Sequence, residues 1–222
     1  SAPTPVSAAL SALVVKGSYF VVLRLMLDVM PDGYLPGAAT LLGVLGAAAI
    51  VWGSVQALIQ TRIKLLVAYS TVAQIGYLFL VFPLARNGGD VLALALTGAL
   101  VHAIAHGFAK GGLFLAAGSL ITRFGHDRLT EMHGAARATP VLALAVALSG
   151  VTMMGLPPSG GFAAKWLLVS AALTAGEWWW AVVLVLGGLL AAAYMFRLVA
   201  ILIADGPAQT SPAPLPVRTE WL

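Results

Sequence analysis

Long apolar stretches separated by short polar turns dominate the chain. Each is at least about the 20 residues that a helix needs to cross the hydrocarbon core of a bilayer. Segments of alternating apolar and polar residues, which would indicate a membrane β-barrel, are absent. The pattern therefore predicts an all-α, polytopic transmembrane helix bundle with about six spans, at residues 6–27, 36–59, 65–84, 91–121, 140–174 and 178–203.

The fifth stretch is interrupted by the sequence GLPPSGG, which contains Gly155, Pro157, Pro158, Gly160 and Gly161. Two consecutive prolines cannot continue a helix, because each lacks an N–H and each disfavours helical backbone in the residue before it. We therefore expect one helix broken at Pro157–Pro158. Irregular backbone at membrane depth is tolerated only where it packs in protein or lines a polar cavity, and broken helices recur in ion transporters.

The fourth stretch carries three basic side chains, His102, His106 and Lys110, at intervals of four residues. On an α-helix this spacing places them along one face. A basic side chain near the bilayer centre costs about 2.5–3.5 kcal/mol on insertion scales, so a row of them indicates a function, and we expect a proton path. Two alternatives are burial for packing and a zinc site at His102 and His106, for which the sequence shows no third ligand.

Two further lysines, Lys16 and Lys165, also fall inside apolar stretches. Burial disfavours the charged form of an amine, so such lysines can exchange a proton near neutral pH. The interiors of the spans contain no Asp or Glu, so a carboxylate partner would have to come from outside this chain. The simpler alternatives are that Lys16 extends to the membrane surface and that Lys165 only caps the broken helix.

The third stretch contains a polar patch of four side chains, Tyr69, Ser70, Thr71 and Gln74. These side chains could hold water for proton transfer, or they could form hydrogen bonds between neighbouring helices. The sequence leaves both interpretations open.

Charged residues divide unevenly between the two ends of the predicted helices. When successive ends are assigned alternately to two sides, one side collects Arg62, Lys64, Arg123, Arg128, Arg137, Arg197 and Arg218. The other side holds Arg24 and Arg86 together with the acids Asp28, Asp32, Asp90 and Glu177. The positive-inside rule then predicts that the first side is cytoplasmic. Near the second side, the run Trp178, Trp179 and Trp180 is typical of an aromatic anchor at the membrane interface.

Composition excludes several classes of protein. Of the 222 residues, 60% are apolar and 9% charged, and the mean hydropathy is +0.97, which indicates an integral membrane protein. The chain has no cysteine, which excludes disulfides and thiolate or iron–sulfur ligation within it, and we expect no cofactor. The net charge of +4 does not indicate nucleic-acid binding, because no basic stripe with interleaved aromatic residues lies outside the spans.

The chain begins SAPTPVS, without Met and without a signal-peptide pattern, so we expect a fragment or a processed chain. Residues 1–204 are expected to form the transmembrane bundle. Residues 205–222 are rich in proline and are expected to form a polar tail.

Four motifs, in this order, resemble the antiporter-like proton-translocating membrane subunits of complex I, the Mrp-type Na⁺/H⁺ antiporters and the membrane-bound hydrogenases. They are SAPTPVSAALSALVVKGSY, RIKLLVAYSTVAQIGY, HAIAHGFAKGGLFLAAGS and GLPPSGGFAAKW, and they cover residues 1–165. The core of that family consists of two inverted five-helix repeats. The resemblance implies that this chain is the second repeat with its flanks, the C-terminal half of the conserved core.

The resemblance also implies a buried Lys/His proton relay. Lys16 matches the lysine that connects the two half-channels in that family. His102, His106 and Lys110 match the central H-x3-H-x3-K run. Lys165 matches the terminal group near the periplasmic exit, where lysine is typical of the Mrp-type and distal complex I subunits.

These matches imply proton translocation, with Na⁺/H⁺ exchange as an open alternative, across the bacterial inner membrane. The chain would act with other membrane subunits of a multisubunit complex, of the NADH:quinone oxidoreductase or hydrogenase type, and would have no catalytic centre of its own.

Two departures from the family pattern, Arg62 where an acid is frequent and Ser11 where His is frequent, favour a structural or assembly subunit without transport. The first repeat, which would supply another buried lysine and its glutamate, also has no counterpart here. A third hypothesis is a stand-alone secondary transporter whose substrate binds at the broken span.

Overall fold

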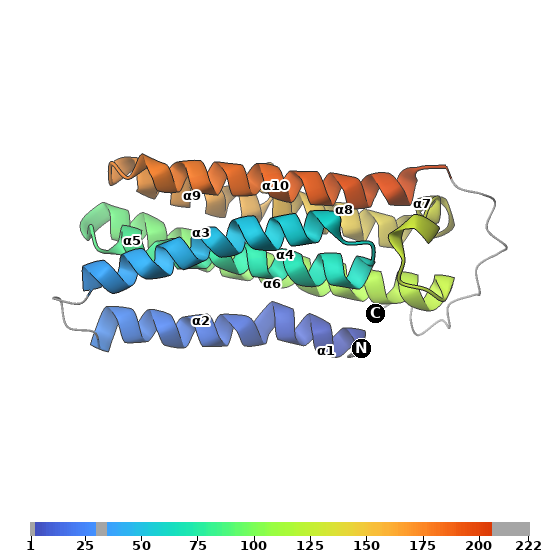
Figure 1. The fold of residues 1–222 in the computed structure, drawn as a ribbon, viewed down its shortest axis with the longest axis horizontal. Helices are drawn as coiled ribbons and strands as arrows, with labels where there is room; N and C mark the ends of the chain where they lie inside the picture. The colour runs from blue at the N-terminus through green and yellow to red at the C-terminus, as the bar shows by residue number, and fades with distance from the viewer. Residues whose placement is uncertain (1–2, 30–34, 206–222) are drawn as a thin grey trace.

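The computed structural model describes residues 3–29 and 35–205 (Figure 1). These residues form helices joined by short turns, with no strand longer than an isolated bridge. Five helical segments are long and apolar enough to cross a membrane, and two shorter apolar helices make up the broken fifth stretch. The predicted all-α polytopic bundle is confirmed. Asp32, Arg218 and the predicted tail beyond Asp205 lie outside the described residues.

The helices follow the predicted spans within a few residues at each end. The first span comprises α1 (Thr4–Ala9), α2 (Val15–Arg24) and two π-helical segments, Leu10–Val14 and Leu25–Val29. The next three spans are α3 (Leu35–Ile59), α4 (Ile63–Phe79) with α5 (Val81–Ala85), and α6 (Gly89–Phe124). A connection with a 3₁₀ turn (Leu129–Glu131) and α7 (Ala135–Ala138) leads to α8 (Pro140–Met154), α9 (Gly160–Thr174) and α10 (Trp178–Ile203).

The helix break lies between α8 and α9, as the two prolines predicted. Gly155 ends α8 with φ of 81°, the left-handed conformation that glycine adopts most readily. The Oγ of Ser159 caps α9 by accepting a hydrogen bond from the N–H of Phe162 at 3.2 Å. Pro157 and Pro158 between them are exposed on the surface of the chain.

The long helix α6 lies at the centre of the bundle, where it contacts α1, α4, α5, α8 and α9 (Figure 1). Beside it, α3 packs closely against α4 at two glycines. A Cβ added to Gly46 would lie 2.7 Å from the carbonyl oxygen of Gly76, so the two backbones come as close as their atoms allow. Small residues at such crossings are typical of membrane bundles, in which helices associate largely by close packing.

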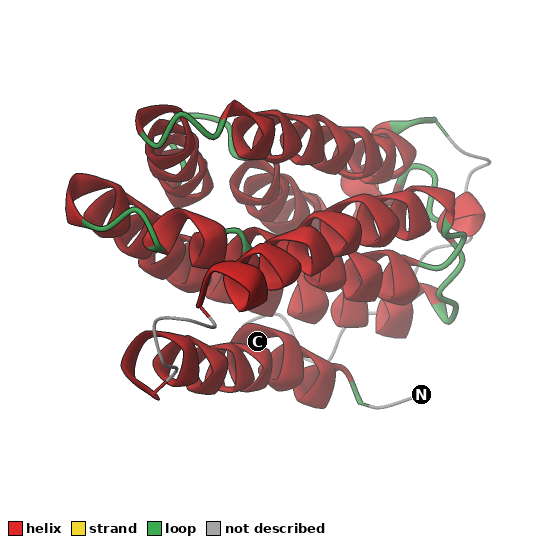
Figure 2. Ribbon diagram, turned by 60° about the vertical axis from the view of Figure 1, so that its left-hand side comes forward, coloured by secondary structure: helices red, strands yellow, loops and turns green. Residues whose placement is uncertain are grey.

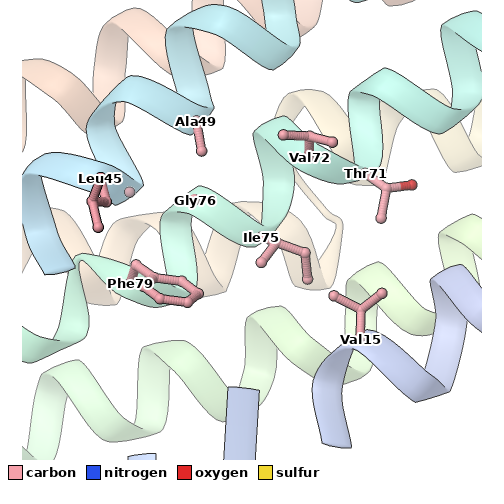
Figure 3. Close-up of a pocket in the computed structure, with 9 residues that line it drawn as sticks. Val15, Leu45, Ala49, Thr71, Val72, Ile75, Gly76 and Phe79 are labelled. Carbon is pink, nitrogen blue, oxygen red and sulfur yellow. The ribbon is translucent and has the colours of Figure 1, made fainter. Parts of the chain in front are cut away.

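The first span lies along one edge of the bundle, away from α8, α9 and α10 (Figures 1 and 2). Its N-terminal part contacts α6, where Thr4 packs so closely on Gly118 that an added Cβ would lie 2.4 Å from it. Further along, the ring of Tyr19 packs against Phe79 and Phe82 at centroid distances of 5.9 Å. Between this span and α3–α4 lies a cavity of about 320 Å³ that is apolar apart from Thr71 (Figure 3).

The end of the bundle that the sequence predicts to be cytoplasmic is closed by main-chain and arginine contacts. The segment at Arg62 forms an antiparallel bridge with the segment at Arg128. The guanidinium of Arg197 donates hydrogen bonds to the carbonyl oxygens of Leu58 and Gln60, both at 2.8 Å. These carbonyls end α3 and are left without helical partners, which a cation at a helix C-terminus satisfies.

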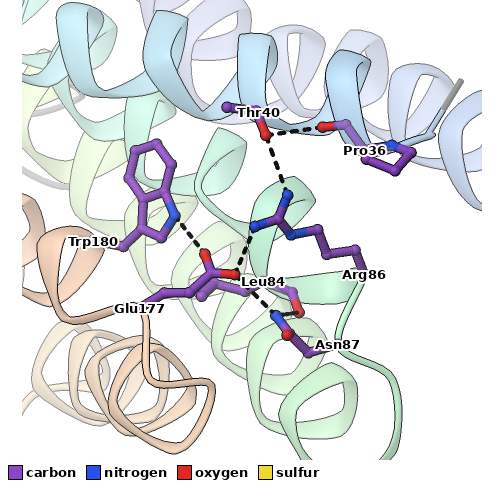
Figure 4. A network of polar contacts seen from close by, with 7 residues as sticks. All are labelled: Pro36, Thr40, Leu84, Arg86, Asn87, Glu177 and Trp180. Atoms are coloured by element: carbon purple, nitrogen blue, oxygen red, sulfur yellow. Dashed lines mark hydrogen bonds and ion pairs between the residues drawn. The ribbon is translucent and has the colours of Figure 1, made fainter.

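At the opposite end, a polar network joins α3, α5 and α10 (Figure 4). The carboxylate of Glu177 is only 6% exposed and pairs with the guanidinium of Arg86 at 2.9 Å. It also accepts a hydrogen bond from the indole N–H of Trp180 at 2.8 Å, and Arg86 donates to the hydroxyl of Thr40. Trp178 is exposed, but Trp180 is 6% exposed, so the prediction of an interfacial anchor is wrong for Trp180, which packs inward to reach Glu177.

Candidate functional site

The three basic residues of α6 are buried along one face of the helix. His102 and His106 are 2% exposed, and Lys110 is fully buried. The two imidazole rings stack with centroids 5.8 Å apart and an interplanar angle of 6°. The spacing of four residues therefore produces the continuous row that the sequence predicts, with one ring directly over the next.

Lys110 is held by the facing side of α4. Its Nζ donates hydrogen bonds to the carbonyl oxygen of Val67 at 2.7 Å and to the hydroxyl of Ser70 at 2.5 Å. The same carbonyl also accepts from the hydroxyl of Thr71 at 3.2 Å. Lys110 thus forms no ion pair with a described residue, and its hydrogen-bond acceptors come from α4.

Lys16, on the first span, is linked to the polar patch of α4 through Ser11. Its Nζ donates to the carbonyl oxygen of Ser11, at 2.5 Å, in the π-helical segment Leu10–Val14. The hydroxyl of Ser11 in turn shares a hydrogen bond of 2.8 Å with the hydroxyl of Thr71 on α4. Ser11 and Thr71 therefore connect the surroundings of Lys16 with those of Lys110. The predicted extension of Lys16 to the membrane surface is not seen, since its amine turns back to its own helix.

His102 contacts α4 one turn further along. Its Nε2 lies 3.0 Å from the main-chain carbonyl oxygen of Gln74. A carbonyl can only accept, so Nε2 carries a hydrogen, and in the neutral ring Nδ1 keeps its lone pair. That Nδ1, and both ring nitrogens of His106, have no hydrogen-bond partner among the described residues. Both rings therefore have a nitrogen that can take up a proton.

Lys165 lies at the helix break. Its Nζ donates to the carbonyl oxygens of Met153 at 2.9 Å and Met154 at 3.1 Å, the last two residues of α8. These carbonyls have no helical partners, and the C-terminal end of a helix attracts a cation. The amine also lies 4.6 Å from the ring centroid of Tyr77 on α4. Capping of α8 by Lys165, one of the two predicted alternatives, is observed.

Lys110, His102 and Lys165 all contact one face of α4. Val67, Ser70, Gln74 and Tyr77 follow one another at intervals of three or four residues, the period of a helix face. In the sequence this face could be recognised by polar residues that recur at helical spacing inside an apolar span. The sequence predicted the polar patch but missed Tyr77.

Metal binding finds little support in this arrangement. Zinc at His102 and His106 would require further ligands. Within residues 3–29 and 35–205, no group of three His, Asp or Glu residues lies close enough to hold a metal ion.

Comparison with known proteins gives the family. Residues 1–191 match the family model described as NADH:quinone oxidoreductase/Mrp antiporter, transmembrane. The chain belongs to this family. It is accordingly a multi-pass integral membrane protein, in agreement with its five long apolar helices.

Individual relatives within this family include subunits of respiratory complexes. The chain is 36% identical over 218 residues to NADH-quinone oxidoreductase subunit N of Desulforudis audaxviator, which covers 96% of this chain and 42% of that protein. It is 32% identical over 204 residues to subunit L of Escherichia coli, covering 90% and 31%. It superimposes on a chain of the Mrp complex from Dietzia with a TM-score of 0.81 and 29% identity, covering 96% and 38%. The chain thus spans less than half the length of these relatives.

Proposed function

We propose that the chain is the ion-translocating core of a membrane subunit, in which protons pass along Lys16, Lys110, His106, His102 and Lys165. One observation carries this proposal. Lys110, His102 and Lys165 contact the polar face of α4, Lys16 is linked to it through Ser11 and Thr71, and the ring of His106, between Lys110 and His102 on α6, stacks on that of His102. Residues 1–204 would form this translocating unit.

The chemistry of the groups supports proton transfer. Each lysine hydrogen-bonds to carbonyl or hydroxyl oxygens, and such oxygens can accept from a charged or a neutral amine. Protons would enter from the cytoplasmic side, reach Lys16, cross the α6 row through water and leave by Lys165. A charge gained at one group disfavours a second charge on its neighbour, so a proton arriving at one end drives the next one onward.

Its relatives support a multisubunit setting. They are subunits of NADH-quinone oxidoreductases, and a structural neighbour belongs to an Mrp complex. We therefore propose that partner subunits or an opposing ion gradient supply the driving force. The transported ion would be H⁺, with Na⁺ as the counter-ion to be tested.

The test compares Lys110→Met and His106→Ala in the complete protein with its partner subunits, in inverted membrane vesicles. Proton movement is followed with a pH-sensitive dye and Na⁺ movement with a Na⁺ indicator. We expect at least a tenfold loss of transport at normal assembly, because the row is interrupted at its centre. Phe108→Leu on the same helix is the control, since the Phe108 side chain is 82% exposed and points away from the row.

Unchanged transport in the Lys110 and His106 variants, at normal assembly, would contradict the relay. That outcome would favour the alternative of a structural or assembly subunit without its own transport.

A further inference from the structure

Two residues of α4, Gln74 and Tyr77, contact both the histidine row and the helix break. They lie three residues apart on one face of α4, where they contact His102 of α6, Met153 of α8 and Lys165 of α9. Gln74 is 1% exposed and Tyr77 is fully buried. Neither belongs to the predicted relay, and both are placed where that relay passes from α6 to α9.

The ring of Tyr77 contacts both a histidine and a lysine. Its centroid lies 5.4 Å from that of His102 and 4.6 Å from the Nζ of Lys165. The hydroxyl points at Gly187 on α10, where an added Cβ would lie 2.5 Å from it, and it has no hydrogen-bond partner among the described residues. The aromatic ring, rather than the hydroxyl, is therefore the part of Tyr77 that contacts the two basic groups.

Gln74 makes a second connection through its amide and its main chain. Its Nε2 donates to the carbonyl oxygen of Met153 at 3.1 Å and to the hydroxyl of Tyr194 at 3.3 Å. Lys165 donates to the same Met153 carbonyl, while the main-chain carbonyl of Gln74 accepts from His102. Gln74 thus donates to one of the two carbonyls that accept from Lys165. Its own main-chain carbonyl accepts the hydrogen bond that orients His102.

We propose that Tyr77 and Gln74 are positioning residues that couple the protonation of Lys165 to His102, an inference that rests on the proposed relay. The face of the ring attracts Lys165 only while the amine is charged, because the attraction acts between a cation and the ring quadrupole. The two protonation states of Lys165 therefore hold the Tyr77 ring with different strength. Because the same ring packs on His102, a change in its attraction to Lys165 also changes its contact with the histidine row.

The two carbonyls of α8 keep Lys165 in place in both states. A neutral amine still has two N–H groups to donate to Met153 and Met154, and a charged amine has a third directed at the ring. The ring contact is therefore the part of this site that changes with protonation. Gln74 holds the Met153 carbonyl against α4, the helix that also carries Tyr77.

The experiment separates the ring from the hydroxyl in the complete protein with its partner subunits. Tyr77→Phe keeps the ring, and we expect transport within about twofold of the native rate. Tyr77→Leu removes the ring face, and we expect a loss of about tenfold or more, since a desolvated cation–π contact contributes on that scale. Tyr77→Met has the same expected loss, and its flexible side chain refills the space if the leucine variant fails to assemble.

Tyr19→Leu is the matched control. Tyr19 is also a buried tyrosine whose hydroxyl has no hydrogen-bond partner among the described residues, but its ring packs on the rings of Phe79 and Phe82 and not on a basic group. We expect it to retain transport. Gln74→Leu removes the donor to Met153 while keeping similar volume, and we expect it to lower transport in the same direction as Tyr77→Leu.

A double-mutant cycle on the melting temperature of the purified protein measures the contact independently of transport. Tyr77→Leu, Lys165→Met and the double variant are compared, and we expect the two single effects to be non-additive. Additive effects, or native transport in Tyr77→Leu, would overturn the coupling. Native transport in Lys165→Met would instead overturn the proposed relay, so the two failures are distinguishable.

Discussion

Lys16, Lys110 and Lys165 share an unusual environment for buried or half-buried amines. Each donates to main-chain carbonyl oxygens, and none forms an ion pair with a described residue. A buried carboxylate partner would be left as an uncompensated charge whenever the lysine released its proton, which is costly in a low-dielectric interior. Carbonyl oxygens carry no net charge, so each lysine can change protonation state without that penalty. This residue-scale property is compatible with the proposed proton relay.

The hydroxyl pair of Ser11 and Thr71 gives a first prediction at this scale. We expect Thr71→Val to lower proton transport several-fold, because it breaks a hydrogen bond that joins the surroundings of Lys16 to α4. Its effect on stability should be small, since hydrogen bonds between membrane helices contribute about 0.6 kcal/mol on average. Transport in vesicles and the melting temperature of the purified protein measure the two effects separately.

Thr122→Val is the matched control, because among the described residues the hydroxyl of Thr122 bonds only to a carbonyl of its own helix. Ser11→Ala should lower transport as much as Thr71→Val, and combining the two should cause little further loss. If Thr71→Val and Thr122→Val transport alike, the hydroxyl pair has no part in the relay.

At the scale of single elements, the break between α8 and α9 is what brings Lys165 to its acceptors. The two α8 carbonyls would bond within an unbroken helix, and only the termination at Gly155 frees them for the amine. Two residues at the break must be glycine for steric reasons. A Cβ at Gly155 would lie 2.7 Å from Cδ of Lys165, and one at Gly161 would lie within 1.8 Å of the carbonyl oxygen of Thr152.

Alanine substitutions at the break test this steric role. We expect Gly161→Ala to lower the melting temperature most, because its Cβ would overlap a backbone atom that cannot move without shifting α8. Gly155→Ala should also destabilise, by about 1–2 kcal/mol for left-handed backbone alone, and should displace Lys165. Gly111→Ala on α6 is the control, since nothing lies within 4 Å of its added Cβ. Equal melting temperatures for all three variants would contradict this explanation.

The sequence predicted the elements better than their contacts, and the reason is physical. Hydropathy sets where a chain enters and leaves a bilayer, so α3 and α10 begin and end within about a residue of the predicted spans. The pairing of side chains depends on how each helix is rotated about its axis, which a nearly uniform apolar span leaves open. Hence the acceptors of Lys165, the partner of Ser11 and the burial of Glu177 emerged only from the structure.

At the scale of the whole molecule, the two ends of the bundle differ in how their charges are compensated. At one end the Arg86 guanidinium is neutralised by the buried Glu177 carboxylate (Figure 4). At the other end the arginines outnumber their acidic partners, and the contacts that link α3, α10 and the connection after α6 are mostly made by main-chain groups. Basic residues resist translocation, so we expect this excess to orient the bundle with that end in the cytoplasm.

This orientation can be measured directly, because the chain contains no native cysteine and a single introduced one is the only thiol in it. We expect Asp90→Cys to react with a membrane-impermeant maleimide in intact cells, since Asp90 is exposed at the Arg86 end. Arg128→Cys should react only after the cells are opened, because the Arg128 side chain is 67% exposed at the opposite end. Ser70→Cys, fully buried beside Lys110, should stay unlabelled in both conditions and controls for non-specific reaction. Labelling of Arg128→Cys but not Asp90→Cys in intact cells would reverse the orientation, and with it the proposed direction of proton movement from Lys16 to Lys165.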